Sequence, residues 1–285
     1  MGALSGLRVL DLSGETGALC SRLLSGMGAE VVRGALAEPG LRGQVAAADV
    51  FLESFPPGHL ASLGLGYQDL VVANPRLIMA SITPFGQEGP YKDFHASDIT
   101  LQALGGWMSV TGLPDKPLML SGSQAYYTAS LFAVNGILLA LRHRRRTGRG
   151  QHLDISVFEC VVASLDHVLP RYFYGGIISQ RQGSLHWNNA FRVFPCADGY
   201  ILLSLHRDWS TLVELLAAEG MAEDLADVKW RDGEERNRGI SHIIVVLGKW
   251  TLRHRVAELV EMGQLMRFPW AEVAGAAPGR AGSKR

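Results

Sequence analysis

The chain has 285 residues, of which 47% are hydrophobic, and its 27 basic residues balance its 27 acidic ones. This much apolar material can form one large domain or two modest ones. A formal net charge of zero gives no global attraction to nucleic acid or to a membrane surface. The apolar runs are short and interrupted, so we expect no membrane span, no signal peptide and a cytoplasmic protein.

Cysteines and basic residues offer few signals of function. Cys20, Cys160 and Cys196 are odd in number and too widely spaced for a pair of metal ligands. This predicts buried thiols in a reducing compartment and no metal site. The one dense basic run covers residues 142–149. A solvated helix end is the favoured interpretation of this run, and a patch for an anionic ligand is the alternative.

The first half of the chain alternates strand and helix patterns. Residues 7–12 read as a buried strand, 13–17 as a glycine turn, 19–27 as a helix, and 29–33, 49–53 and 77–82 as further strands. Strand, helix and strand in this order form a βαβ unit, which requires a parallel sheet. We therefore predict an α/β fold, doubly wound and Rossmann-like, with a mostly parallel sheet. The first turn lacks the GxGxxG spacing of dinucleotide-binding sites, so the sequence disfavours a nicotinamide or flavin enzyme.

The second half changes in character near residue 184. A long helix is predicted at 121–141, and a strand that enters a helix at 151–168. A β-hairpin at 191–194 and 200–205 is followed by helices at 209–219 and 240–261. These patterns predict a large α/β domain over residues 1–183, a smaller α+β domain over 184–273 and a disordered tail over 274–285.

Six stretches, taken in order, carry a resemblance to a known family. They are residues 4–12 with 28–32, DVFLESFPPG at 49–58, LGY at 65–67, SITPFGQEGP at 81–90, TGRGQHLDIS at 147–156 and FPCADGY at 194–200. Each stretch alone is ordinary, but six in the correct order are hard to explain by chance. The sequence resembles the family III CoA transferases, which move coenzyme A between carboxylic acids. The resemblance implies an enzyme whose large domain binds CoA and whose co-substrates are an acyl-CoA and an acid.

Such a transfer requires a group that holds the acyl moiety while CoA changes partners. A carboxylate can attack the thioester carbonyl and form a mixed anhydride, with backbone N–H groups stabilising the oxyanion. In transferase members of the family the nucleophilic aspartate lies five positions beyond the site of Asp154, which is Glu159 here. Glu159 is therefore the candidate nucleophile and Asp154 the second candidate. The competing interpretations are a helix-face residue for Glu159 and a structural strand-end acid for Asp154.

The resemblance also implies contacts with CoA itself. It suggests Ser54 and Phe55 beside the adenine end, where Phe55 could stack on a base or anchor a buried loop. It implies the turn with Gly14, Thr16 and Gly17 beside the pantetheine arm. Gly86 and Gln87 are expected to shape the same cleft. For each of these residues a packing or turn role is the alternative.

Two departures from the family pattern leave alternatives open. Relatives carry a phosphate-contacting arginine in a long loop after position 33, where only Arg33 or Arg42 could substitute. The chain also lacks the family's closing segment, so we expect a homodimer or a heteromer with a relative. A catalytically silent or partner-dependent subunit is the second hypothesis. The third, a 2-methylacyl-CoA racemase, is disfavoured because Ser97 stands where the racemase histidine would be, and His95 lies two residues away.

Overall fold

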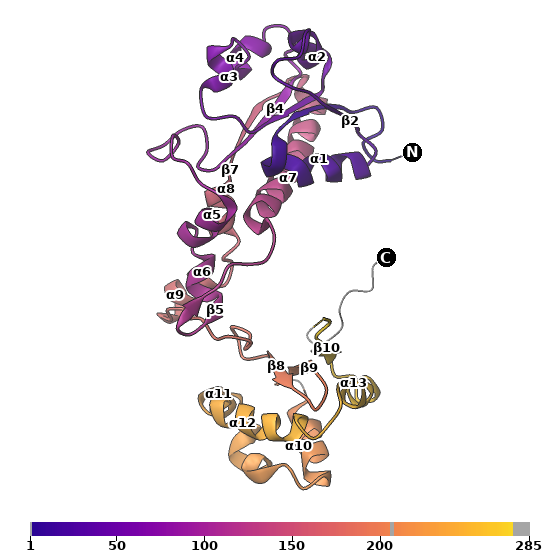
Figure 1. Ribbon diagram of the computed structural model, residues 1–285, viewed down its shortest axis with the longest axis vertical. Coiled ribbons are helices and arrows are strands. Elements are labelled where there is room, and N and C mark those ends of the chain that lie inside the picture. The colour runs from indigo at the N-terminus through magenta and orange to yellow at the C-terminus, as the bar shows by residue number, and fades with distance from the viewer. Residues whose placement is uncertain (1, 206–207, 276–285) are drawn as a thin grey trace. The chain divides into compact units, whose positions relative to one another are not determined.

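The computed structural model describes residues 2–205 and 208–275. It divides into two compact units, Met1–Arg181 and Gln182–Arg285 (Figure 1). Residues 276–285, which make up most of the predicted tail, lie outside the described residues. The assignment of CoA binding to residues 1–183 stays a prediction.

The first unit is built on a five-stranded parallel sheet with the strand order β2-β1-β3-β4-β7. Its strands are β1 (Arg8–Leu12), β2 (Glu30–Arg33), β3 (Val50–Glu53), β4 (Ile78–Thr83) and β7 (His152–Ser156). The central strands β3 and β4 are buried along their whole length, as expected when helices cover both faces of a parallel sheet. The predicted α/β, doubly wound fold is confirmed.

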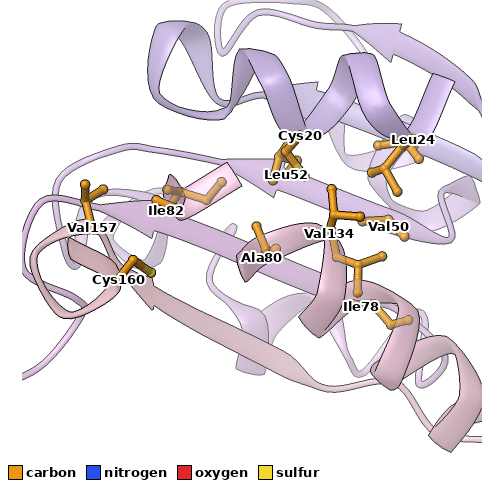
Figure 2. Close-up of a cluster of buried hydrophobic side chains, with 14 of the residues drawn as sticks. Cys20, Leu24, Val50, Leu52, Ile78, Ala80, Ile82, Val134, Val157 and Cys160 are labelled. Atoms are coloured by element: carbon orange, nitrogen blue, oxygen red, sulfur yellow. The ribbon is translucent and has the colours of Figure 1, made fainter. Parts of the chain in front are cut away.

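Helices α1 (Gly14–Gly26) and α7 (Gln124–Thr147) pack together over one face of this sheet. Figure 2 shows Cys20 and Leu24 of α1 and Val134 of α7 against alternate residues of β3 and β4, including Leu52 and Ala80. Residues of one strand alternate between the two faces. Their neighbours therefore point to the second core, under α2 (Leu41–Ala47), α3 (His59–Ser62) and α4 (Tyr67–Leu70).

The remaining elements of the first unit follow β4 and β7. They are α5 (Asp98–Leu104), α6 (Trp107–Val110), the short pair β5 (Gly112–Leu113) and β6 (Lys116–Pro117), α8 (Val157–Ala163) and α9 (Val168–Gly175). The helix predicted to run through residue 168 ends earlier, at Ala163. Its C-cap, Ser164, donates its hydroxyl to the carbonyl of Val161 and accepts the indole N–H of Trp107. This side chain competes with the continuation of the helix.

The second unit has its own core and a three-stranded antiparallel sheet. Its elements are β8 (Phe191–Pro195), β9 (Tyr200–Ser204), β10 (Ala271–Glu272), α10 (Trp209–Ala218), the 3₁₀ turns η1 (Glu223–Ala226) and η2 (Val228–Arg231), α11 (Gly233–Arg238), α12 (Ile240–Thr251) and α13 (Val256–Leu265). The predicted hairpin is confirmed as β8–β9. The helix predicted over 240–261 is instead two helices, because Asp198 accepts the N–H of Val256 at 2.8 Å and starts α13 separately.

Among the described residues, α7 alone is long and apolar enough to cross a membrane by length and composition. Core helices of soluble proteins pass the same test. One side of α7 is buried against α1 and the sheet, with Ala129, Ala133 and Ile137 fully covered. This packing accounts for its apolar composition.

The basic run at the end of α7 is mostly solvated, as predicted, with one exception. Arg144 is 7% exposed and forms an ion pair with Asp49, with Nη2 2.9 Å from Oδ1. Its Nη1 also donates to the carbonyls of Asp49 and Arg76. Arg144 therefore ties the end of α7 to the amino ends of β3 and β4. It is not available to an anionic ligand.

We predict that Arg144→Ala destabilises the first unit by about 3 kcal/mol, because it removes the buried ion pair with Asp49 and the hydrogen bonds to two carbonyls. Arg145→Ala is the matched control. It removes an exposed arginine from the same helix and is expected to change stability by less than about 0.5 kcal/mol. Urea unfolding followed by circular dichroism measures both variants. Equal midpoints for the two variants would contradict the structural role of Arg144.

Candidate functional site

The strand order locates a site before any side chain is considered. The chain moves outward from β1 to β2, then crosses to the other side of β1 to form β3. In open parallel sheets, ligands bind at the carboxyl ends of the strands on either side of such a reversal. The loops at this point are residues 13–17 after β1 and residues 54–55 after β3. Both contain residues that the sequence predicted to contact CoA.

Two buried acids hold these two loops. Asp11, 5% exposed, accepts both the N–H and the hydroxyl of Ser13 on Oδ1, at 2.8 and 2.6 Å. Glu53, 2% exposed, accepts the N–H of Phe55 on Oε2 at 2.8 Å. The hydroxyl of Ser54 donates to the carbonyl of Ser13 and joins the loops directly. The structure therefore brings Ser54 and Phe55 together with the glycine turn.

The residues of the glycine turn have different roles. Gly14 has a φ of +58°, which favours glycine, and it is exposed. Gly17 is buried, and a Cβ there would lie 2.2 Å from the hydroxyl oxygen of Ser13. Thr16 accepts a hydrogen bond from Ser130 on its carbonyl at 3.2 Å. Gly17 and Thr16 therefore shape the turn, while Gly14 faces outward, where a ligand can approach.

A cavity of about 380 Å³ opens at the ends of β1 and β2. Gly14 and Glu15 line one side of it, and Arg33 and Gly34 the other. The Arg33 side chain is 73% exposed, with Nε 3.9 Å from Oδ2 of Asp11. Because the Ser13 hydroxyl is turned to Asp11, it does not cap α1. The first N–H groups of α1 therefore remain available at this cavity, together with the positive end of the helix dipole.

Asp154 holds the third loop of this edge. Its Oδ2 accepts the N–H of Gln87 at 2.9 Å. The preceding residue, Gly86, has a φ of +86°, and a Cβ there would lie 3.3 Å from the same oxygen. The structure thus brings Asp154, Gly86 and Gln87 together in one arrangement. This hydrogen bond gives Asp154 a structural role, and its assignment as the second candidate nucleophile stays a prediction.

Glu159 lies in the first turn of α8, directly after β7. Its N–H donates to the hydroxyl of Ser156, which caps the helix at 3.2 Å. The neighbouring N–H of Phe158 donates to the carbonyl of Pro84, which joins α8 to the loop of Gly86. The side chain of Glu159 is exposed. Within the described residues its carboxylate makes no hydrogen bond or ion pair, and it lines neither cavity at this edge.

The residues at the position of the racemase motif have structural roles. Asp98 accepts the N–H groups of Ala125 and Tyr126 on Oδ1, at 2.8 and 3.2 Å, and so caps the start of α7. Ser97 precedes α5 as its N-cap residue, and His95 is exposed in the loop before it. These contacts use Asp98 to join α5 to α7.

Glu53, Ser81 and His152 form a polar cluster on the other face of the sheet, and the sequence motifs do not indicate it. Ser81 of β4 and His152 of β7 are hydrogen-bonded, with 2.8 Å between Oγ and Nε2. Burial raises the pKa of Glu53 and lowers the pKa of His152. A signal was present, since Glu53 ends a strand whose other residues are apolar, and acids are almost never fully buried without partners.

All three cysteines lie in the described part of the chain as buried free thiols, and burial raises the pKa of Cys20 and Cys160 to about 12. They are therefore poor nucleophiles. Across residues 2–205 and 208–275, no group of three or more His, Cys, Asp or Glu side chains is arranged to hold a metal ion.

Comparisons with known proteins agree with this geometry. Residues 38–279 match CoA-transferase family III. The chain is 30% identical, over 91% of its length, to the succinyl-CoA:(R)-benzylsuccinate CoA-transferase subunit BbsE of Thauera aromatica, and the match covers 76% of that relative. It is 34% identical, over 75% of its length, to the succinyl-CoA–D-citramalate CoA-transferase of Chloroflexus aurantiacus.

The second of these matches covers 54% of the relative, so the chain spans about half the length of that enzyme. Among solved structures, a CAIB/BAIF family protein from Brucella suis matches with a TM-score of 0.83 and 26% identity. That match covers 95% of this chain and 84% of the other. The family match extends over most of the sequence and includes the loop after β3. The chain belongs to CoA-transferase family III.

Proposed function

We propose that this chain transfers coenzyme A between two carboxylic acids, with an acyl-CoA as co-substrate and Glu159 as the nucleophile. The observation that carries the proposal is the family match over residues 38–279. The relatives described above are named as succinyl-CoA transferases. Succinyl-CoA is therefore the donor to test first, with a second organic acid as the acceptor.

The reaction proceeds in steps that balance. The Glu159 carboxylate attacks the thioester carbonyl, the C–S bond breaks, and an acyl–glutamyl anhydride and the CoA thiolate form. The thiolate then attacks the glutamyl carbonyl, which releases the first acid and leaves CoA on Glu159 as a thioester. The acceptor carboxylate attacks this thioester, the C–S bond breaks, and a second anhydride and the CoA thiolate form. The thiolate finally attacks its acyl carbonyl, which yields the new acyl-CoA and restores Glu159.

The cavity between the start of α1 and Arg33 is the proposed site for the CoA phosphates. Arg33 is the better candidate because its guanidinium is exposed at this cavity. The guanidinium of Arg42 instead contacts the carbonyl of Leu63 at 3.4 Å. The first N–H groups of α1, which the Ser13 side chain does not cap, and the arginine on the opposite wall can together bind a phosphate. Glu15 also lines the cavity, and its negative charge limits how closely a phosphate can approach that wall.

The proposed chemistry requires a second chain that covers Glu159. The carboxylate of Glu159 is exposed in the single chain, and an acyl anhydride has to be protected from water. Helix α9 has no buried residue, and its Phe173 and Tyr174 are 74% and 93% exposed. Exposed apolar surface of this kind marks an interaction site. We therefore propose a homodimer, or a heteromer with a relative, in the cytoplasm.

A second candidate function is a catalytically silent or partner-dependent subunit of the same fold. The exposed carboxylate of Glu159 favours it, because no group of this chain is hydrogen-bonded to that carboxylate in the described residues. One relative is itself named as a subunit. The two candidates differ in whether the chain forms an acyl-enzyme by itself.

We predict that hydroxylamine, added to the purified chain with succinyl-CoA, converts Glu159 to a hydroxamate that mass spectrometry detects. Glu159→Gln is expected to abolish the label because the nucleophile is lost. Asp154→Asn is the matched control and is expected to retain the label on Glu159. Label on Asp154 would contradict the assignment. Label that appears only when a full-length relative is added would favour the partner-dependent subunit.

We also predict that Arg33→Ala weakens CoA binding by about tenfold to a hundredfold, the loss expected for one charge-assisted hydrogen bond. Arg42→Ala is the comparison, and we expect less than a threefold change. Calorimetric titration with CoA at low and high salt measures the dissociation constants of both variants. The loss of affinity caused by Arg33→Ala should become smaller as the salt concentration rises. A larger loss in Arg42→Ala than in Arg33→Ala would contradict the proposed phosphate site.

A further inference from the structure

A second cavity, of about 220 Å³, lies behind the loop of Ser54 and Phe55 and plays no part in the proposed reaction. Its polar wall includes Glu53, Ser81 and His152. These residues belong to three adjacent strands, β3, β4 and β7, and their side chains share the sheet face opposite α1 and α7. The cavity is therefore lined by a row of polar side chains that ends at Glu53, the residue before the loop of Ser54 and Phe55.

The three side chains form one line of polar groups across the strands. Nε2 of His152 lies 2.8 Å from Oγ of Ser81, and Ser81 is the cross-strand neighbour of Glu53, whose pKa it lowers by hydrogen bonding. When Glu53 is ionised its carboxylate can only accept, so in that state the single proton of Ser81 points to Glu53. Oγ of Ser81 must then accept from His152, which fixes the proton of the imidazole on Nε2. Each group has one consistent direction of donation.

Both ends of this line are held in place. The ring of His152 stacks on Tyr67 of α4, with 5.5 Å between centroids and an interplanar angle of 17°. At the other end, Oε2 of Glu53 accepts the N–H of Phe55 at 2.8 Å. A displacement of the imidazole or the loss of Ser81 would free the Glu53 carboxylate to rotate. The Phe55 N–H would then lose its partner.

The pKa of Glu53 is subject to opposing influences. Burial raises the pKa of Glu53, the hydrogen bonds from Ser81 and Phe55 lower it, and the nearby Asp154 raises it again. Asp69 of α4 also lines the cavity. Without Ser81 the carboxylate would keep its burial and its repulsion from Asp154 but lose one of its two donors, which weakens its hold on the loop.

We propose that His152 and Ser81 are positioning residues that act through Glu53 to orient the loop of Phe55 for CoA binding. This inference rests on the proposed function, because it assumes that the Phe55 loop contacts CoA. The effect is on the binding of CoA. The chemical step at Glu159 should not change, since Glu159 lies on α8 and has no hydrogen bond to any of these groups.

The test combines two measurements on the full chain with the variants Ser81→Ala, His152→Ala and His152→Gln. Amide hydrogen exchange by NMR reports the protection of the Phe55 N–H, and calorimetry reports the dissociation constant of CoA. We expect Ser81→Ala and His152→Ala to speed Phe55 exchange about tenfold and to weaken CoA binding about tenfold. His152→Gln keeps an N–H donor and is expected to stay within threefold of the wild type. With succinyl-CoA, KM should rise while kcat is retained.

His143→Ala, at an exposed position of α7, is the matched control and should change neither reading. His152 lies on the edge strand β7, so its variants are expected to fold even where Ser81→Ala does not. Unchanged Phe55 exchange in folded His152→Ala would overturn the hydrogen-bonded line. A wild-type chain that binds CoA, with His152→Ala equally tight, would overturn this inference alone. A wild-type chain that binds no CoA would overturn the proposed function and this inference with it.

Discussion

The arrangement of the site depends on one recurrent interaction, a carboxylate on a strand of the parallel sheet that accepts a backbone N–H from a loop at its carboxyl edge. Asp11 holds Ser13, Glu53 holds Phe55 and Asp154 holds Gln87. Asp11 and Glu53 are buried, and buried carboxylates are costly unless hydrogen bonds satisfy them. Asp154 is exposed. Once satisfied, each bond fixes the position of its loop relative to the strand. The three loops that the sequence predicts to contact CoA are thus fixed by acids that do not themselves have to touch the ligand.

This arrangement explains why the same edge can combine rigidity with access. The loop after β3 is hydrogen-bonded to the loop after β1 through the Ser54 hydroxyl, so the two loops are held together at the strand ends. Outside it, Gly14, Arg33 and the start of α1 surround an open cavity. Glu159 follows the last strand at the same edge, and its neighbour Phe158 joins α8 to the third loop through its N–H to the Pro84 carbonyl and its ring beside Phe85. The proposed nucleophile is therefore positioned by contacts of the helix start, and its carboxylate is left free to react.

Much of the fold could be predicted from the sequence because it is encoded locally. The apolar runs of the strands, the glycines between them and the order strand–helix–strand were sufficient to predict the parallel sheet. Helix ends were less predictable. The end of α8 at Ala163 and the break before α13 depend on Trp107 and Asp198, which are distant in sequence. The burial of Arg144 inside a basic run depends in the same way on Asp49.

The site was predicted in part, for a similar reason. Family motifs indicated Gly14, Ser54 and Gln87, and the structure brings the first two into linked loops. The line from His152 to Glu53 could not be derived, because it joins three strands whose register becomes known only when the sheet is assembled. The carboxylate of Glu53 has a sequence signal, but its partner Ser81 has none. A serine within an apolar strand is ordinary until a buried acid is found beside it.

The most direct test of this account is a titration of the isotope-labelled chain with CoA, followed by NMR of the backbone amides. The account predicts that the amides of Gly14, Arg33 and Phe55 shift together along one saturable curve, while those of the second unit near α12 stay unchanged. If saturating CoA leaves these amides unmoved, or shifts residues away from the carboxyl edge of β1 and β3, the proposed site is contradicted.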